Sequence, residues 1–202
     1  METQAIDIKK ALIEAIKENL SGFDLSNSFK QRSVGDKIED DCAEIVKRLC
    51  PDNYLPARSA RSTEDFTLKF GENKTYVDIK THFVQETEGF SMPNLISVDK
   101  LRKILVDERL ALAYVFIDYT RDANGAVSIE KVEVKYVWEL DWSMLGIGAL
   151  GKGQLQIKNA NKELVFTDIA KQKWLEILKS KVSEFYVKQI EKITREQAKW
   201  KL

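Results

Sequence analysis

Apolar residues near the start of the chain recur three or four positions apart, the spacing that places them on one face of a helix. Between residues 2 and 20 they are Ile8, Leu12, Ile13, Ile16 and Leu20. A second helix is predicted over 34–49, with inner residues Ile38, Cys42, Ile45, Val46 and Leu49. A long third helix is predicted from Asp168 to about Lys199, with Thr167 as its N-cap.

A period of two replaces the helical period in the middle of the chain. Residues 65–70 and 75–81 alternate polar and apolar side chains around the turn 71–74, which predicts a β-hairpin. A helix is predicted at 98–110, and further strands at 112–119, 129–137, 155–157 and 164–166. This order of elements predicts an α/β fold, a mixed central β-sheet flanked by helices, in a single domain over 1–202.

Composition fits this picture. Of the 202 residues, 44% are hydrophobic and 32% charged, which suffices for a core and a charged surface. Cys42 and Cys50 are eight residues apart in a predicted helix, about 12 Å along its axis, too far for a disulfide. The first residues lack a signal-peptide pattern, and no run of about 18 apolar residues predicts a membrane span. We therefore expect a cytoplasmic protein with no membrane partner.

Charge gives little indication of a partner. The 32 basic and 32 acidic residues cancel, whereas nucleic-acid-binding proteins are usually basic. The excess is local: residues 179–201 hold seven Lys and Arg against three Glu. A charge-rich helix is more often a solvated face than a binding surface, so this excess is weak evidence for DNA binding.

The candidate chemistry lies on the predicted hairpin. Asp78 and Lys80 are two residues apart on one strand and therefore point to the same face, where Asp65 of the other strand can meet them. Two close carboxylates disfavour each other's ionisation unless a cation lies between them. Mg²⁺ takes oxygen ligands of this kind, so the pattern predicts magnesium-assisted phosphodiester hydrolysis.

A structural interpretation of the same residues is also open. Asp65 and Lys80 could form an exposed cross-strand ion pair, and a D-x(12)-D-x-K spacing alone occurs by chance in many proteins. Glu39, in the preceding predicted helix, could bring a third carboxylate to the site. It could equally be a solvated acid beside Asp40 and Asp41.

The hairpin and the segment after it resemble a known family. The strings 64–68 and 77–81 are similar to the catalytic hairpin of EcoRV-type restriction endonucleases of the PD-(D/E)xK superfamily. The segment 91–101 resembles the loop and helix start that follow the catalytic lysine in HincII, and the likeness continues in patches from about residue 34 to 190. Glu64 stands where the family motif has its proline.

The resemblance implies a role for each matching residue. It makes Asp65 and Asp78 the metal ligands, adds the backbone carbonyl of Ile79, and makes Lys80 the catalytic lysine. It places Asn94 at base edges in the major groove, where Asn suits adenine. It also places Ser91 or Met92 against the DNA stack.

The function implied is that of a type II restriction endonuclease. It would be a homodimer that cuts both strands of double-stranded DNA at a short palindrome with Mg²⁺. The ends would be blunt with 5′-phosphates, and the enzyme would work beside a cognate DNA methyltransferase in a prokaryotic cytoplasm. Alternatives are a repair or junction-resolving nuclease of the same superfamily, or a non-catalytic DNA-binding module.

Several other residues are weaker candidates. The stretch 146–153 nearly matches a P-loop but lacks its hydroxyl, so we predict a flexible loop, in which Lys152 could meet a phosphate and Gln154 a base. His82, the only histidine, could touch a phosphate or be an exposed loop residue. Arg58 and Arg61 could clamp a phosphate or be solvated.

Overall fold

The computed structural model describes residues 13–18, 20, 31–59, 62–84, 93–159 and 162–200. The chain divides into two compact units, and each is described by itself. Unit 1 comprises Met1–Gly89 and Asp107–Val137, and unit 2 comprises Phe90–Val106 and Trp138–Leu202. The single domain expected over 1–202 stays a prediction.

The described part of unit 1 contains a five-stranded mixed sheet in the order β1-β2-β3-β5-β6. Strands β3 and β5 are parallel, and the other neighbours are antiparallel. The predicted hairpin is confirmed as β2 and β3, joined at Gly71, whose φ of 60° suits glycine. The strand bounds are β1 Tyr54–Pro56, β2 Phe66–Phe70, β3 Asn73–Phe83, β5 Leu110–Arg121 and β6 Val127–Tyr136.

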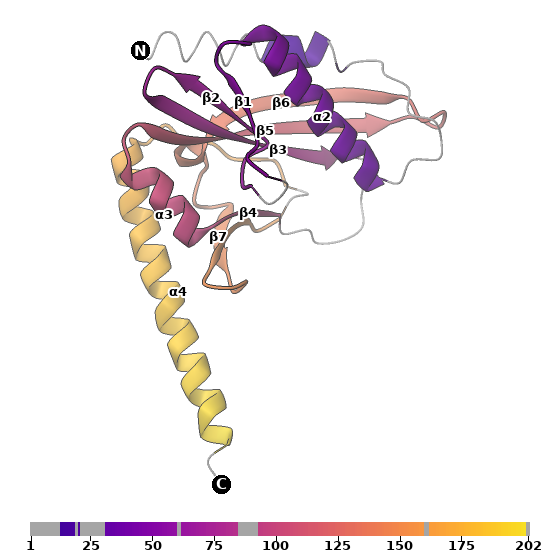
Figure 1. Cartoon of the computed structure of the whole chain (residues 1–202). Helices are drawn as coiled ribbons and strands as arrows, with labels where there is room; N and C mark the ends of the chain where they lie inside the picture. Colours follow the sequence, from indigo (N-terminus) through magenta and orange to yellow (C-terminus); the bar gives the residue numbers. More distant parts are fainter. Residues whose placement is uncertain are drawn as a thin grey trace. The chain divides into compact units, whose positions relative to one another are not determined.

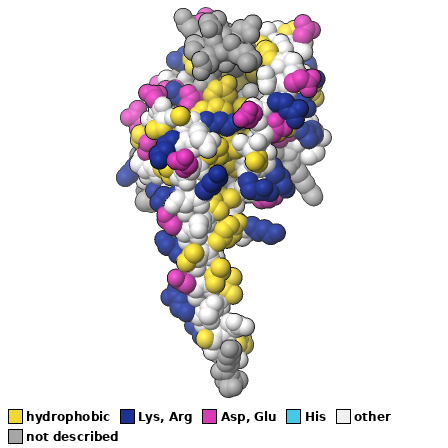
Figure 2. Space-filling model, turned by 90° about the vertical axis from the view of Figure 1, so that its left-hand side faces the viewer, with side chains coloured by type: hydrophobic (Ala, Val, Ile, Leu, Met, Phe, Trp, Pro, Cys, Tyr) yellow, Lys and Arg dark blue, Asp and Glu magenta, His cyan; other side chains and the backbone are white. Residues whose placement is uncertain are grey.

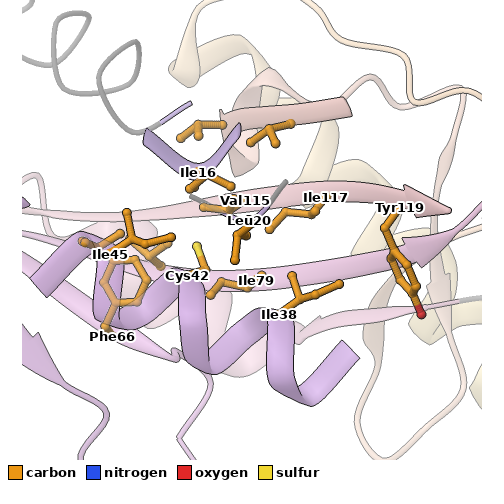
Figure 3. Close-up of a cluster of buried hydrophobic side chains, with 14 of the residues drawn as sticks. Ile16, Leu20, Ile38, Cys42, Ile45, Phe66, Ile79, Val115, Ile117 and Tyr119 are labelled. Carbon is orange, nitrogen blue, oxygen red and sulfur yellow. The ribbon is translucent and has the colours of Figure 1, made fainter. Parts of the chain in front are cut away.

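Helix α2 (Gln31–Leu49) covers one face of this sheet (Figure 1). Figure 3 shows its inner residues Ile38, Cys42 and Ile45 packed with the odd-numbered side chains of β3 and β5. Residues 13–18 and 20 are helical, and Ile16 and Leu20 join the same core. This packing leaves the even-numbered side chains of β3 on the opposite face.

Close approach of α2 to β3 depends on one glycine. A Cβ on Gly35 would lie 2.7 Å from Oγ1 of Thr81, so a larger residue would push the helix away. Glu39 follows one turn later on the same helix. The tight contact therefore helps to set the distance between β3 and the part of α2 that carries Glu39.

The described part of unit 2 contains a three-stranded antiparallel sheet in the order β4-β8-β7. Its strands are short: β4 Asn94–Ser97, β7 Leu145–Gly148 and β8 Gln154–Ile157. Helix α3 (Val98–Val106) follows β4 directly and buries Val98, Leu101, Ile104 and Leu105. A 3-10 turn, η1 (Val137–Glu139), spans the boundary between the two units.

Helix α4 (Lys171–Lys199) has two different halves. In the first half Trp174 is fully buried, donates its indole N–H to the Leu140 carbonyl at 2.9 Å and packs against the tilted ring of Trp142. The second half exposes Tyr186, Val187, Ile190, Ile193 and Trp200, with Ile190 and Ile193 each 64% exposed. Figure 2 shows hydrophobic side chains running along the helix.

Some predictions were wrong in detail. Leu49 is 48% exposed rather than buried, because α2 extends past the edge of its core contacts. The N-cap of α4 is Ala170, since the Thr167 N–H instead bonds to Glu139 beside the Leu140–Phe166 bridge. The stretch 146–153 begins inside strand β7 and is a loop only after Gly148. Helix α3 ends at Val106, before β5 begins.

The strand predicted at 164–166 is only a single bridge at Phe166, and strands β1 and β4 were not predicted. The α/β class with its long C-terminal helix is confirmed. Over the described ranges, no helix is long and apolar enough to cross a membrane.

Candidate active site

The site lies where β3 runs past the end of β2. Phe66, the first residue of β2, pairs with Val77, whereas β3 continues to Phe83 and pairs with β5 on its other side. Asp65 immediately precedes β2, and its N–H bonds to the Val77 carbonyl at 2.8 Å. Its carboxylate Oδ2 accepts a hydrogen bond from the Ile79 N–H at 2.6 Å. The Asp65 side chain thus takes the place of a β2 backbone group beyond the end of that strand.

These two bonds define the direction of the β3 backbone. The carbonyl of Val77 and the N–H of Ile79 both face the β2 side. The backbone N–H and carbonyl of one strand residue point toward the same neighbouring strand. The Ile79 carbonyl therefore also faces the side of β3 where β2 has ended. A main-chain oxygen therefore joins the carboxylate of Asp65 there.

Asp78 and Lys80 lie on the face of β3 opposite the core, as predicted. Asp78 is only 6% exposed, and Lys80 Nζ lies 2.7 Å from its Oδ2. Lys80 is thus the cation beside the buried Oδ2, and no other donor bonds to this oxygen among the described residues. Burial raises the pKa of Asp78 to about 7, and the Lys80 ammonium only partly offsets that rise.

The pKa values of Glu39 and Asp65 are also raised. Burial, followed by the charge of Asp65, raises the pKa of Glu39 to about 7, while Lys80 lowers it. Burial also raises the pKa of Asp65, against the opposing effects of the Ile79 N–H and Lys80. Glu39, Asp65 and Asp78 therefore lie close enough to influence one another, with one lysine between them.

This arrangement fits a divalent cation bound by a few protein oxygens. The described residues contain no group of three or more Asp, Glu, His and Cys side chains already converged as a metal cage. Mg²⁺ does not require one, because it commonly keeps several waters and takes one or two carboxylates. The Asp78 carboxylate, the Asp65 carboxylate and the Ile79 carbonyl are suitable metal ligands.

The same face continues onto β5. Tyr114, directly beside Asp78 in the register, is fully buried, and its hydroxyl has no hydrogen-bond partner in the described structure. Burial and the Asp78 charge raise the Tyr114 pKa well above its usual value. Two residues beyond Lys80, His82 Nδ1 lies 3.1 Å from Asp118 Oδ1, so His82 is a paired strand residue rather than a free loop residue.

The remaining predicted residues fall elsewhere. Arg58 donates to the Tyr76 hydroxyl at 3.0 Å. Asn94, Lys152 and Gln154 belong to unit 2, where Lys152 is exposed in the turn before β8 and Gln154 begins that strand. Ser91, Met92 and Arg61 lie outside the described residues.

One residue of interest was not among the predicted site residues. Gln156 on β8 donates to Asn94 on β4 at 2.6 Å. The alternation of Gln154, Leu155 and Gln156 was the available signal, because it places both amides on one face.

Comparison with known proteins bears on the fold. The chain is similar to NlaIV restriction endonuclease, with a TM-score of 0.59 and 16% identity over 89% of this chain and 78% of that one. The fold is restriction-endonuclease-like. No family model and no curated protein sequence matched. At this identity the likeness establishes the restriction-endonuclease-like fold, and a kinship to HincII or EcoRV in particular stays a prediction.

Proposed function

We propose that this chain is a magnesium-dependent type II restriction endonuclease that hydrolyses both strands of double-stranded DNA. The observation that carries the proposal is the buried Asp78 beside Lys80, at the open edge that Asp65 and Glu39 share. Several buried carboxylates that share one lysine are costly unless a further cation neutralises them. The restriction-endonuclease-like fold supports the same function.

Asp65, Asp78 and the Ile79 carbonyl would hold Mg²⁺. When bound, the ion would supply charge neutralisation at the phosphate and a lowered pKa of attacking water. The Ile79 N–H holds Asp65 in place, so one residue would fix a carboxylate through its N–H and offer its own carbonyl. Burial of Asp78 limits the competition from bulk water for its oxygens.

Lys80 would act on the substrate side of the site. Its side chain is 30% exposed while its Nζ contacts Asp78, so it would reach a phosphate oxygen or a water without leaving the carboxylate. There it would orient the water that attacks phosphorus and offset the charge that develops on the phosphate oxygens. Attack in line with the 3′ oxygen leaves the phosphate on the 5′ end.

Glu39 would take a secondary role. Its pKa of about 7 lets it exchange a proton near neutral pH, and α2 holds it beside Asp65. It would accept a proton from water or add a ligand through a bridging water. The tight Gly35–Thr81 contact would keep this carboxylate in place.

The finer assignment follows the resemblance to EcoRV-type enzymes. We propose blunt cleavage at a short palindromic site, with Asn94 reading a base and a cognate methyltransferase protecting host DNA in a prokaryotic cytoplasm. Lys152 and Gln154 would contact backbone and base, and His82 a phosphate, as the sequence predicted. Ser91 or Met92 would approach the DNA base stack.

A palindromic site favours a two-fold dimer. The exposed half of α4 offers a surface for a second copy, because Tyr186, Ile190, Ile193 and Trp200 follow the spacing of a coiled-coil seam. The positions flanking this seam are Val187, Gln189, Thr194 and Glu196, so charge is nearly absent there. Two copies of this helix could therefore pack seam to seam without bringing many like charges together.

A direct experiment tests the nuclease proposal. The intact protein is incubated with a long unmethylated duplex and Mg²⁺, beside the Asp78→Ala variant and an EDTA control, and fragment ends are sequenced. Discrete fragments that both controls abolish support the proposal. No cleavage of varied unmethylated DNA overturns the restriction assignment. Cleavage of branched DNA alone would then indicate a junction-resolving nuclease, and binding without any cleavage a DNA-binding module.

A further inference from the structure

The small sheet of unit 2 presents two amides as a pair. Asn94 and Gln156 are opposite each other in the antiparallel register of β4 and β8. Gln156 Nε2 donates to Asn94 Oδ1 at 2.6 Å, although the residues are 62 positions apart. Asn94 is exposed and Gln156 half-buried, so the pair lies at the surface with one member anchored in the sheet.

The hydrogen bond between the two amides determines which of their polar atoms stay available to a ligand. One amide N–H bonds to one amide oxygen, which leaves the NH₂ of one residue and the oxygen of the other available. Here the free donor belongs to Asn94 and the free acceptor is Gln156 Oε1. Rotating both amides by 180° exchanges the two roles but still offers one donor and one acceptor.

A glycine makes room for this arrangement. A Cβ on Gly148 of β7 would overlap Oε1 and the amide carbon of Gln156. Gly148 has no positive φ, so its backbone conformation does not itself require glycine. We attribute the glycine to the space that the Gln156 amide occupies.

The adjacent position on β7 is also side-chain-free. Gly146 lies opposite Gln156 in the register, and Gly148 lies opposite Gln154. Strand β7 therefore places no side chain of its own beside the amides, and the aliphatic part of Lys158 packs over Gly146. A flat base edge can approach a strand of this kind more closely than one lined by large side chains.

We propose that Asn94 and Gln156 act as one unit that reads the major-groove edge of an adenine; this rests on the proposed function. Adenine offers an acceptor, N7, next to a donor, the N6 amino group. The free amide donor would bond N7 and the free amide oxygen would accept from N6. Guanine presents two acceptors on this edge, and neither cytosine nor thymine offers the adjacent pair.

The test is selection of duplexes from a randomised library by the intact chain, with Ca²⁺ in place of Mg²⁺ so that binding is read without cleavage. Wild-type protein is expected to enrich an adenine at one position of each half-site. Asn94→Ala and Gln156→Ala should each relax the preference at that same position by about tenfold to a hundredfold. The double variant should relax it no further than the stronger single variant.

Two further variants separate reading from mere folding. Gly148→Ala keeps both amides but should displace Gln156 and relax the same position. Lys158→Ala removes an exposed side chain just after β8 and should leave that position unchanged. Each variant is used at a temperature where its thermal unfolding shows it to be folded.

The outcomes distinguish the two proposals. Selected adenine without Mg²⁺-dependent cleavage overturns the nuclease and supports the amide pair. Cleavage or binding whose base preference is unchanged in Asn94→Ala and Gln156→Ala, or altered at two different positions, overturns the amide pair. A library with no enriched base also overturns it.

Discussion

The sheets of the two units use polar residues in opposite ways. The sheet of unit 1 holds Asp78 at 6% exposure, with Lys80 Nζ 2.7 Å from its carboxylate. The sheet of unit 2 carries neutral amides, Asn94 and Gln156, which share one hydrogen bond; Asn94 is exposed and Gln156 half-buried. Buried charge is costly and suits catalysis once a cation is bound, whereas paired amides cost little and suit recognition. Under the proposed function, the first sheet would carry the chemistry and the second would read bases.

The largest expected effect is the loss of cleavage in Asp78→Ala. Changing a residue that merely orients a metal ligand costs about 10- to 100-fold, so removing the ligand itself should lower the rate by more than about 100-fold. Single-turnover cleavage with saturating enzyme measures this. Asp118→Ala is the matched control, because Asp118 lies on the same face of β5 and pairs with His82. Equal losses in the two variants would contradict the assignment of Asp78.

The next effect concerns α4. Ile193→Glu places a charge in the exposed apolar seam, and about 1.5–3 kcal/mol of burial per isoleucine would be lost on each copy. The dimer should therefore weaken by about 100-fold or more, as light scattering over a concentration series would show. Lys188→Glu changes a charged residue outside that seam and should leave the mass unchanged. A wild-type monomer at all concentrations would refute the α4 dimer.

A smaller effect is expected in stability without metal. Asp78 has a pKa of about 7 in the folded protein against an ordinary value of 3.8, so folding takes up a proton between these values. The stability that Asp78 contributes is full below about pH 4 and is lost as pH rises through 7. Asp78→Asn should therefore stabilise the metal-free protein at pH 8 by about 1–3 kcal/mol. Urea unfolding at pH 5 and pH 8 measures this, and a variant less stable than wild type at pH 8 would contradict it.

The smallest expected effect is that of Glu39→Gln. Glutamine keeps the size of the side chain but cannot take up a proton, so cleavage should fall by about tenfold or less and require more Mg²⁺. Glu44→Gln, an exposed acid on the same helix, should change neither. A loss as large as that of Asp78→Ala would instead make Glu39 a primary ligand.

The local sequence pattern predicted the β2–β3 hairpin. Asp78 and Lys80 share a face because they are two residues apart, and the turn at Gly71 brings Asp65 to them. Burial of these groups could not be predicted, because it depends on β5 and on Tyr114, far along the chain.

The small sheet could not be predicted for a related reason. Strands β4 and β7 are four residues each, too short for a clear period, and two glycines weaken the pattern of β7. The Asn94–Gln156 bond joins residues 62 apart, so only the fold brings them together. Gln156 therefore did not appear as a candidate beside Gln154.

The most direct test of the charged site is calorimetric titration of the intact protein with Mg²⁺ at pH 7, in buffers of different ionisation enthalpy. Since Asp78 and Glu39 each have a pKa of about 7, metal binding should release protons, and the release should fall as the pH is raised to 8.5. We expect Mg²⁺ binding with proton release in wild type and no Mg²⁺ binding in Asp78→Ala. Mg²⁺ binding that is the same in both, or none in either, would contradict it.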